Sequence, residues 1–299
     1  MPTREPDPRA DARRTWRARN RAAQRHEAAD VLGREIGRRM LERLDLVRLP
    51  EGAIADVGCA TGATTRLLQQ RYPERLVVGI DPSIGLLALH PTASGPLARF
   101  RALLGVGRAN RVAADPARLP LRPGSAALVW SNLLLHAVDD AEVAMRSWMS
   151  VLRPGGLLMF STLGPDTLRE LRNAFAAVDT LPHVHEFVDM HNIGDSLVAA
   201  GFADPVMDME IVTLTYATVA GLVADLRGQG LGNTAPARGR GLYPPRRWRE
   251  MTRHYEAARV ADRLPATFEV IQGHAWKPAE GPRRTADGLD IVRVHRHRS

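Results

Sequence analysis

A glycine-rich turn at residues 56–62 constrains the fold of this chain more than any other feature. The turn has the sequence Asp56-Val57-Gly58-Cys59-Ala60-Thr61-Gly62 and ends a short apolar run at residues 54–57. Glycines between a strand and a helix let a ligand approach the backbone at the N-terminus of the helix. The spacing of Gly58, Ala60 and Gly62 lacks the third glycine of the dinucleotide fingerprint. The turn predicts a ligand site at a strand–helix junction of an α/β fold.

The N-terminal half of the chain alternates short apolar runs with helical patterns. The runs that predict strands lie at 54–57, 76–80, 111–114, 126–131 and 157–161, and the helical patterns at 64–72, 84–89 and 141–152. Continuous apolar strands that alternate with helices are typical of a parallel sheet covered on both faces. We therefore expect a doubly wound, mostly parallel sheet.

The pattern changes after residue 161. Helices are predicted at 167–178, 192–200, 218–227 and 246–259, and strands at 206–216 and 267–276. This order predicts an antiparallel late strand and a helical lid inserted over the edge of the sheet. A further helical pattern at residues 12–47 predicts an N-terminal helix that leads into the domain.

Acidic residues follow the first three predicted strands. Asp56 lies in the glycine turn, Asp81 closes the second strand and Asp115 closes the third. Doubly wound sheets bind ligands at the carboxyl ends of their strands. A carboxylate at Asp81 could accept hydrogen bonds from both hydroxyls of a ribose.

The turn, the ordered acids and the segment Leu152-Arg153-Pro154-Gly155-Gly156 together resemble the class I methyltransferases, which have a Rossmann-like fold. The resemblance covers residues 54–156 and implies S-adenosylmethionine as cofactor. It implies that the turn holds the methionine part, that Asp81 binds the ribose and that Asp115 contacts the adenine amino group. The expected cofactor-binding set is Asp56, Gly58, Ala60, Gly62, Asp81, Pro82, Asp115, Pro116, Ser131 and Asn132.

With this family in view the chain divides into five parts. We expect a disordered basic tail at 1–14, an N-terminal helical segment at 15–50, a core that binds S-adenosylmethionine at 51–164, a C-terminal half with the lid and last strands at 165–276, and a flexible basic tail at 277–299.

Composition limits the location and the partners. No apolar run approaches the ~18 residues that span a bilayer, and one cysteine, Cys59, excludes a disulfide framework or a cysteine-based zinc site, so we expect a cytoplasmic protein. His183, His185 and His191 lack further ligands at metal spacing, so no metal is predicted. The net charge of +8 comes from arginine, since Lys277 is the one lysine. This excess fits codon bias in a GC-rich genome, or an acidic partner such as a nucleic acid or a carrier protein.

The residues at the end of the fourth predicted strand limit the kinds of methyl acceptor that the chain could use. Enzymes that methylate base amines or protein amides carry prolines where this chain has Leu133 and Leu134. A cysteine nucleophile is disfavoured because Cys59 lies in the cofactor turn. Oxygen, carboxylate and small-molecule acceptors remain.

The C-terminal half carries a second resemblance. Segments at 160–172, 183–191, 200–202, 214–216, 225–233 and 265–276 resemble the malonyl-acyl-carrier-protein O-methyltransferases of biotin synthesis. The resemblance implies methylation of the free carboxyl of a malonyl thioester. The expected partner is an acidic acyl-carrier protein carrying malonyl, or malonyl-CoA.

A carboxylate with a pKa of about 4 is ionised at neutral pH and needs no general base. An arginine could hold it in a bidentate grip, and we assign this role to Arg227, in the segment that matches the family's lid. Arg169 and Arg172 are alternatives, although charges on a helix face are more often only solvated.

The N-terminal helix departs from the second family. Arg19 and His26-Glu27 stand where that family presents an aromatic residue and Tyr-Asp, and His26 could replace the tyrosine hydroxyl as a donor. Two alternatives follow. One is a methyltransferase-fold protein with another role, such as protein modification or assembly of a respiratory complex. The other is a methyltransferase that binds nucleic acid, which the low aromatic content disfavours.

Overall fold

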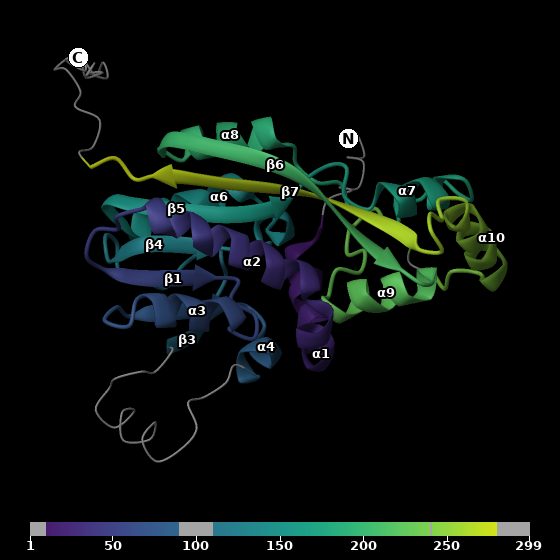
Figure 1. The fold of residues 1–299 in the computed structure, drawn as a ribbon, viewed down its shortest axis with the longest axis horizontal. Helices are drawn as coiled ribbons and strands as arrows, with labels where there is room; N and C mark the ends of the chain where they lie inside the picture. The colour runs from purple at the N-terminus through teal and green to yellow at the C-terminus, as the bar shows by residue number, and fades with distance from the viewer. Residues whose placement is uncertain (1–9, 90–109, 240, 280–299) are drawn as a thin grey trace, which may run out of the picture.

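In the computed structural model, which describes residues 10–89, 110–239 and 241–279, one seven-stranded sheet forms the centre of the molecule (Figure 1). Its strand order is β3-β2-β1-β4-β5-β7-β6. Strands β1 to β5 pair in parallel, and β7 is antiparallel to both of its neighbours. The strands are β1 (Ala53–Val57), β2 (Val77–Asp81), β3 (Asn110–Ala113), β4 (Ala126–Ser131), β5 (Leu152–Leu163), β6 (Ala203–Tyr216) and β7 (Leu264–Trp276). The predicted mostly parallel sheet with an antiparallel late strand is confirmed.

Successive residues of the central strands enter two different cores. On β4, Leu128 and Trp130 pack into one core and Val129 into the other, and all are fully buried. The first core also receives α2 (Val31–Arg43) and α3 (Ala63–Arg71), and the second receives α6 (Ala141–Val151) and α8 (Met190–Ala199). Helices cover both faces, which is why these strands are continuous apolar runs.

The N-terminal segment differs from the single predicted helix. It forms α1 (Ala12–Ala29) and α2, which are interrupted at Asp30. The helix α1 begins inside the predicted tail because the side chain of Asp11 caps it by accepting a hydrogen bond from the Arg14 amide. Residues 1–9 lie outside the described residues.

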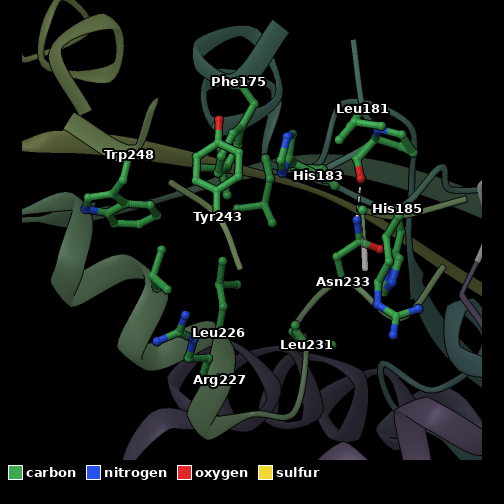
Figure 2. A pocket seen from close by; sticks show the side chains of 18 of the residues that line it. Phe175, Leu181, His183, His185, Leu226, Arg227, Leu231, Asn233, Tyr243 and Trp248 are labelled. Carbon is green, nitrogen blue, oxygen red and sulfur yellow. Dashed lines mark hydrogen bonds between the residues drawn. The ribbon is translucent and has the colours of Figure 1, made fainter. Parts of the chain in front are cut away.

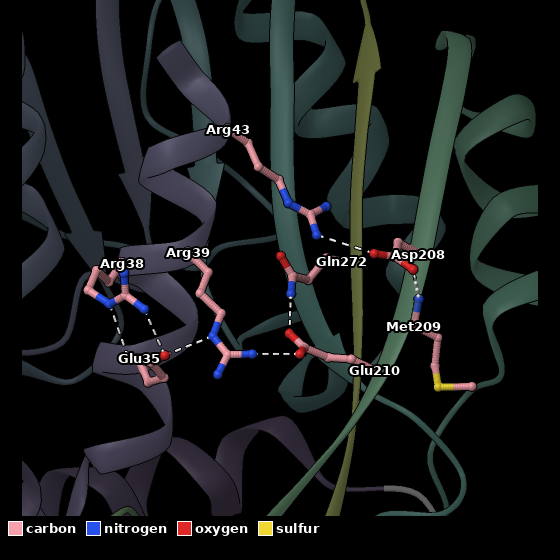
Figure 3. A network of polar contacts seen from close by, with 8 residues as sticks. All are labelled: Glu35, Arg38, Arg39, Arg43, Asp208, Met209, Glu210 and Gln272. Atoms are coloured by element: carbon pink, nitrogen blue, oxygen red, sulfur yellow. Dashed lines mark hydrogen bonds and ion pairs between the residues drawn. The ribbon is translucent and has the colours of Figure 1, made fainter. Parts of the chain in front are cut away.

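Polar contacts hold α2 against the edge of the sheet (Figure 3). Arg39 pairs with Glu35 at 2.8 Å and with Glu210 of β6 at 2.6 Å. Arg43 pairs with Asp208 of the same strand at 3.3 Å. Part of the arginine excess is therefore used in exposed ion pairs within the fold.

The remaining helices gather at the end of the sheet where the parallel strands finish (Figure 1). They are α7 (Arg169–Ala176), α9 (Val219–Gly228) and α10 (Pro245–Glu256); α4 (Ile84–Ala88) follows β2. Both α9 and α10 are inserted between β6 and β7, and α10 packs against α7 while α9 packs against α1. The insertion therefore meets the N-terminal helix over the carboxyl ends of the strands.

The chain remains attached to the core beyond β7. Lys277 Nζ donates hydrogen bonds to the carbonyls of Met149 and Leu152, at 2.9 and 2.6 Å. The predicted start of the flexible tail at residue 277 is therefore wrong, and residues 280–299 lie outside the described residues. None of the helices in the described ranges has the length and apolar character that crossing a bilayer requires.

Candidate active site

The glycine turn joins β1 to α3 with a left-handed backbone at three positions. Gly58, Ala60 and Gly62 have φ of 83°, 49° and 79°, and Gly62 is the N-cap of α3. Ala60 therefore adopts the conformation that a glycine would adopt more easily. Leu133, after β4, also has a positive φ of 47°. Backbone strain at non-glycine residues concentrates at binding sites, and both of these residues line the same cavity.

Two buried acidic residues, Asp56 and Asp81, form hydrogen bonds that hold this turn and the helix after it in place. Asp56 is buried and accepts a hydrogen bond from Thr65 Oγ1 at 2.6 Å. Burial raises the pKa of Asp56 to about 7, against the lowering effect of this bond. Asp81 is fully buried and accepts hydrogen bonds from the amides of Ala60 and Ser83, at 3.1 and 2.8 Å. The structure brings both acids to the turn, but Asp56 faces α3.

A cavity of about 620 Å³, which we call the edge cavity, lies beside the ends of β2 and β3. Trp16, Pro82, Ile84, Asp115 and Val138 are among its lining residues. It combines one strand-end carboxylate with an indole and aliphatic side chains. Pro116 instead points its carbonyl at Trp148, whose Nε1 donates a hydrogen bond of 2.8 Å.

A central cavity of about 60 Å³ lies above the turn. Its walls include Arg19, His26 and Asp30 of the N-terminal segment, residues 58–61 of the turn, and Asn132, Leu133 and His136 after β4. Asn132 is held by donating to the Gly33 carbonyl and by accepting from Ser161, at 2.7 and 2.8 Å. Ser131 is fully buried, and its hydroxyl has no partner among the described residues.

The histidines at this cavity are neutral at physiological pH. Burial lowers the pKa of His26 to about 3, and the charge of Arg19 adds to this effect. The pKa of His136 is lowered to about 3 by the same two causes in the same order. His26 Nδ1 and both ring nitrogens of His136 are shielded from solvent and have no partner in the described part of the chain.

A larger chamber of about 660 Å³ opens next to the central cavity, and the two share Leu163 and Leu231 (Figure 2). Its walls are largely apolar and come from α7, α9, the start of α10 and the segments between these helices. They include Phe175, Leu181, His183, His185, Leu226, Arg227, Asn233, Tyr243 and Trp248. Asn233 Nδ2 donates to the carbonyl of Pro182 at 2.6 Å, which fixes one wall.

The histidines that follow α7 have separate structural surroundings. His183 stacks on Phe175 with ring centroids 3.9 Å apart, and His185 Nε2 accepts a hydrogen bond of 2.8 Å from the Thr234 amide. His191 is exposed beside Asp189. Across residues 10–89, 110–239 and 241–279, no three His, Cys, Asp or Glu side chains gather as a metal site requires.

The three candidate arginines of the C-terminal half lie in different places. Arg227 lines the chamber and is exposed, whereas Arg169 lies outside it and pairs with Asp166 at 3.3 Å. Arg172 donates hydrogen bonds of 3.0 Å to the carbonyls of Pro165 and Thr167. Arg169 and Arg172 do not line the chamber because α7 turns Leu171 and Phe175 inward instead.

An arginine groove of about 530 Å³ continues the chamber outward, and the two share Arg227, Gly232, Asn233 and Arg238. Four arginines of α1, namely Arg14, Arg17, Arg21 and Arg25, line its other side. This groove was not among the sites predicted from the sequence. The signal was present as a three- and four-residue repeat of arginines on one helix face.

Comparison with known proteins places the chain in a family. A methyltransferase domain model matches residues 55–160. A malonyl-[acyl-carrier protein] O-methyltransferase of Laribacter hongkongensis is 45% identical over 93% of this chain and 94% of its own length. One of Gallionella capsiferriformans is 44% identical over 95% and 96%. The chain belongs to the malonyl-[acyl-carrier protein] O-methyltransferase family. Among solved structures, the YcgJ protein of Bacillus subtilis has the same fold, with a TM-score of 0.54 at 14% identity over 80% of this chain and 97% of that one.

Membership of this O-methyltransferase family makes the protein an S-adenosylmethionine-dependent methyltransferase. The residues present fit that cofactor. A Cβ at Gly58 would lie 2.9 Å from Leu134 Cδ1, so the turn passes Leu134 too closely for any residue but glycine and leaves its backbone open to a ligand at the N-terminus of α3. Asp115 among apolar side chains in the edge cavity fits an aromatic base with an amino group. Asp81 holds the Ala60 amide of the turn and precedes Pro82 of the edge cavity, but it is fully buried and lines neither cavity.

Proposed function

We propose that this protein methylates the free carboxyl of a malonyl group carried on acyl-carrier protein, early in biotin synthesis in the cytoplasm. The observation that carries the proposal is the row of neighbouring cavities, which share lining residues, from the turn through the central cavity and chamber to the arginine groove. An apolar chamber suits a flexible thioester arm, and a basic groove suits the acidic protein to which the arm is attached.

The chemistry requires little of the protein beyond alignment. When bound, S-adenosylmethionine supplies a methyl group on a positively charged sulfur. The malonyl carboxylate attacks without a general base because it is already ionised at neutral pH. The neutral His26 and His136 agree with this, since neither has to remove a proton. The side chains around the central cavity then exclude water and hold the oxygen in line with the methyl carbon.

The cofactor lies, in this proposal, along the ends of β1, β2 and β3. The turn at Gly58, Ala60 and Gly62 holds the methionine part against the N-terminus of α3, where free amides favour a carboxylate. Asp81 would accept hydrogen bonds from the ribose hydroxyls. Asp115 would accept a hydrogen bond from the adenine amino group in the edge cavity. Asn132 positions the wall on the acceptor side, and Asp56 supports the turn from behind.

The carrier protein binds along α1. Arg17 and Arg21 are exposed and face the groove, and Arg227 stands where the groove meets the chamber. A negative partner would be steered to this surface, and the thioester arm would enter past Arg227. Ion pairs of this kind chiefly raise the association rate and weaken with salt.

Methyl transfer to the carrier tests the proposal. The purified protein is incubated with S-adenosylmethionine and malonyl carrier protein, and mass spectrometry detects the gain of one methyl group. Expression should also restore growth without biotin in a strain that lacks this step. Failure of both would refute the function.

A pair of charge reversals tests the docking surface. Arg21→Glu should raise the KM for malonyl carrier protein about tenfold and leave the KM for malonyl-pantetheine unchanged. Arg146→Glu makes the same change of charge at an exposed position of α6, away from the groove, and should change neither KM. Equal effects of the two variants would contradict docking along α1.

A further inference from the structure

Arg19 is a buried cation in the middle of the candidate active site. Its residue is 8% exposed, and it lines the central cavity from α1. The Nε atom is shielded from solvent and has no hydrogen-bond partner among the described residues, where Arg19 also forms no ion pair. Its face lies 5.7 Å from the ring centroid of Trp16.

The charge of Arg19 acts on the carboxyls of Asp81 and Asp30, but neither of them forms a hydrogen bond or ion pair with Arg19 among the described residues. Arg19 opposes the rise that burial causes in the pKa of Asp81 and in that of Asp30. Asp81 already accepts hydrogen bonds from two backbone amides. A buried guanidinium without a hydrogen-bonded anion is costly, so the site has a place for an anion that arrives with a ligand.

Backbone packing holds Arg19 in this position. Gly230, after α9, lies so close that a Cβ there would be 2.5 Å from Arg19 Cγ. A Cβ at Gly228 would lie 2.9 Å from Ala29 Cβ, and Gln229 Nε2 donates to the Ala29 carbonyl at 3.0 Å. Two glycines therefore let the end of α9 press directly on α1, and the arginine side chain is directed into the cavity.

The location indicates which anion Arg19 meets. Arg19 lines the central cavity together with Cys59 of the turn and with His136. The ring of His136 lies edge-on to Phe187 at 5.9 Å, and Phe187 lines the chamber. Arg19 thus lies between the cofactor turn and the chamber from which the acceptor enters. In the proposed function the carboxylate of the methionine part binds at the N-terminus of α3, which leaves Arg19 for the acceptor.

We propose that Arg19 binds the acceptor carboxylate and holds it for methyl transfer. This inference rests on the proposed function and deepens it. Two guanidinium N–H groups grip the carboxylate and leave one oxygen lone pair free. That oxygen forms a bond to the methyl carbon as the carbon–sulfur bond breaks, and the electron pair of the broken bond goes to sulfur. The ester product is neutral, so Arg19 loses its anion and the product is released. Arg19 thus takes the grip that was predicted for Arg227, which is exposed where the chamber meets the groove and guides the carrier instead.

The test compares a free acid with its ester. Malonyl-pantetheine and its methyl ester are titrated by calorimetry into the protein saturated with S-adenosylhomocysteine. The wild type should bind the acid about 30-fold more tightly than the ester. Arg19→Met should abolish this preference and change the Kd of S-adenosylhomocysteine by less than about threefold. Arg19→Lys should restore part of the preference. Arg146→Met, at an exposed position of α6, makes the same substitution away from the site and should behave as the wild type.

Thermal unfolding separates a binding role from a structural one. Removing an unpaired buried charge should leave the Tm of the ligand-free Arg19→Met protein unchanged or higher. A retained preference in Arg19→Met, or an equal loss of S-adenosylhomocysteine affinity, would overturn the inference. A wild type without acid preference would also overturn it. Absent methyl transfer with the preference intact would refute the proposed function alone.

Discussion

Thr65 Oγ1 donates a hydrogen bond to Asp56 Oδ2 across 2.6 Å, and this contact fastens the first turn of α3 to the end of β1. From the sequence, Asp56 was predicted to be one of the cofactor-binding residues. In the structure its carboxyl is buried behind the turn and does not line the cavities next to it. Asp56 thus shapes the cofactor site through the backbone that it holds.

Thr65→Val should destabilise the protein by about 1–3 kcal/mol, because it leaves a buried carboxyl without its hydrogen bond. Urea unfolding at pH 7 measures this. Thr213→Val, on an exposed position of β6, makes the same chemical change and should cost little. Equal costs for the two variants would show that the Asp56 contact is unimportant.

Gly58→Ala should be more harmful than Gly155→Ala. Both glycines have a positive φ, 83° and 73°, so both variants bear the backbone strain of about 1 kcal/mol. An added Cβ has no neighbour within 4 Å at Gly155, but at Gly58 it would lie 2.9 Å from Leu134. We expect a further loss of about 1–3 kcal/mol at Gly58 and weaker binding of S-adenosylhomocysteine. Chemical unfolding and calorimetry would measure the two losses, and identical values would contradict the crowding.

Lys277→Met should cost about 1–3 kcal/mol although residue 277 follows the last strand. Its ammonium donates hydrogen bonds to two carbonyls at the C-terminal end of α6. A positive charge at this end of a helix is also stabilised by the helix dipole. Lys277→Arg keeps the charge and should recover part of the loss. Guanidinium unfolding would compare the three proteins, and an unaffected Lys277→Met variant would mean that the contact contributes nothing.

His136 should make the protein sensitive to acid. Its pKa in the folded state is about 3, against about 6.5 when unfolded, so the unfolded chain takes up a proton first as the pH falls. The stability contribution is fully present above pH 6.5 and declines toward pH 3. His136→Phe should therefore lose about 1–2 kcal/mol less stability than the wild type between pH 7 and pH 5.

Urea unfolding at the two pH values measures this difference. The raised pKa values of Asp30 and Asp56 act in the opposite direction, but they are common to both proteins. His191→Phe is the control because that side chain is exposed. A His136→Phe protein with the wild-type pH dependence would refute the assignment.

The sheet and its ligand-binding edge could be predicted because each buried strand corresponds to a short run of apolar residues in the sequence. The β4 prediction agrees with the structure at both ends, and Asp81 closes β2 while Asp115 comes shortly after β3. Helix faces were harder to assign. The arginines of α7 are seen to point away from the chamber only once Leu171 and Phe175 are placed.

The position of Arg19 depends on contacts between distant segments. Helical periodicity puts it on one face with Thr15, Ala22 and His26, all buried. Periodicity does not show that α9 covers this face, because that follows from Gly228 and Gly230 more than 200 residues later. A charged residue on a predicted amphipathic helix is ordinarily assigned to solvent. Here the tertiary packing decides otherwise.

The ladder between β6 and β7 has a consequence for how enzymes of this build can diversify. Tyr216 of β6 and Leu264 of β7 are paired at the end of this ladder. The segment from residue 217 to residue 263 is therefore an insertion whose two ends lie side by side. A segment whose two ends are adjacent can be lengthened, shortened or exchanged with little strain on the sheet. The part of the chamber wall that lies between residues 217 and 263 is therefore exchangeable as one piece, and a change of acceptor preference there would leave the half that binds the methyl donor untouched.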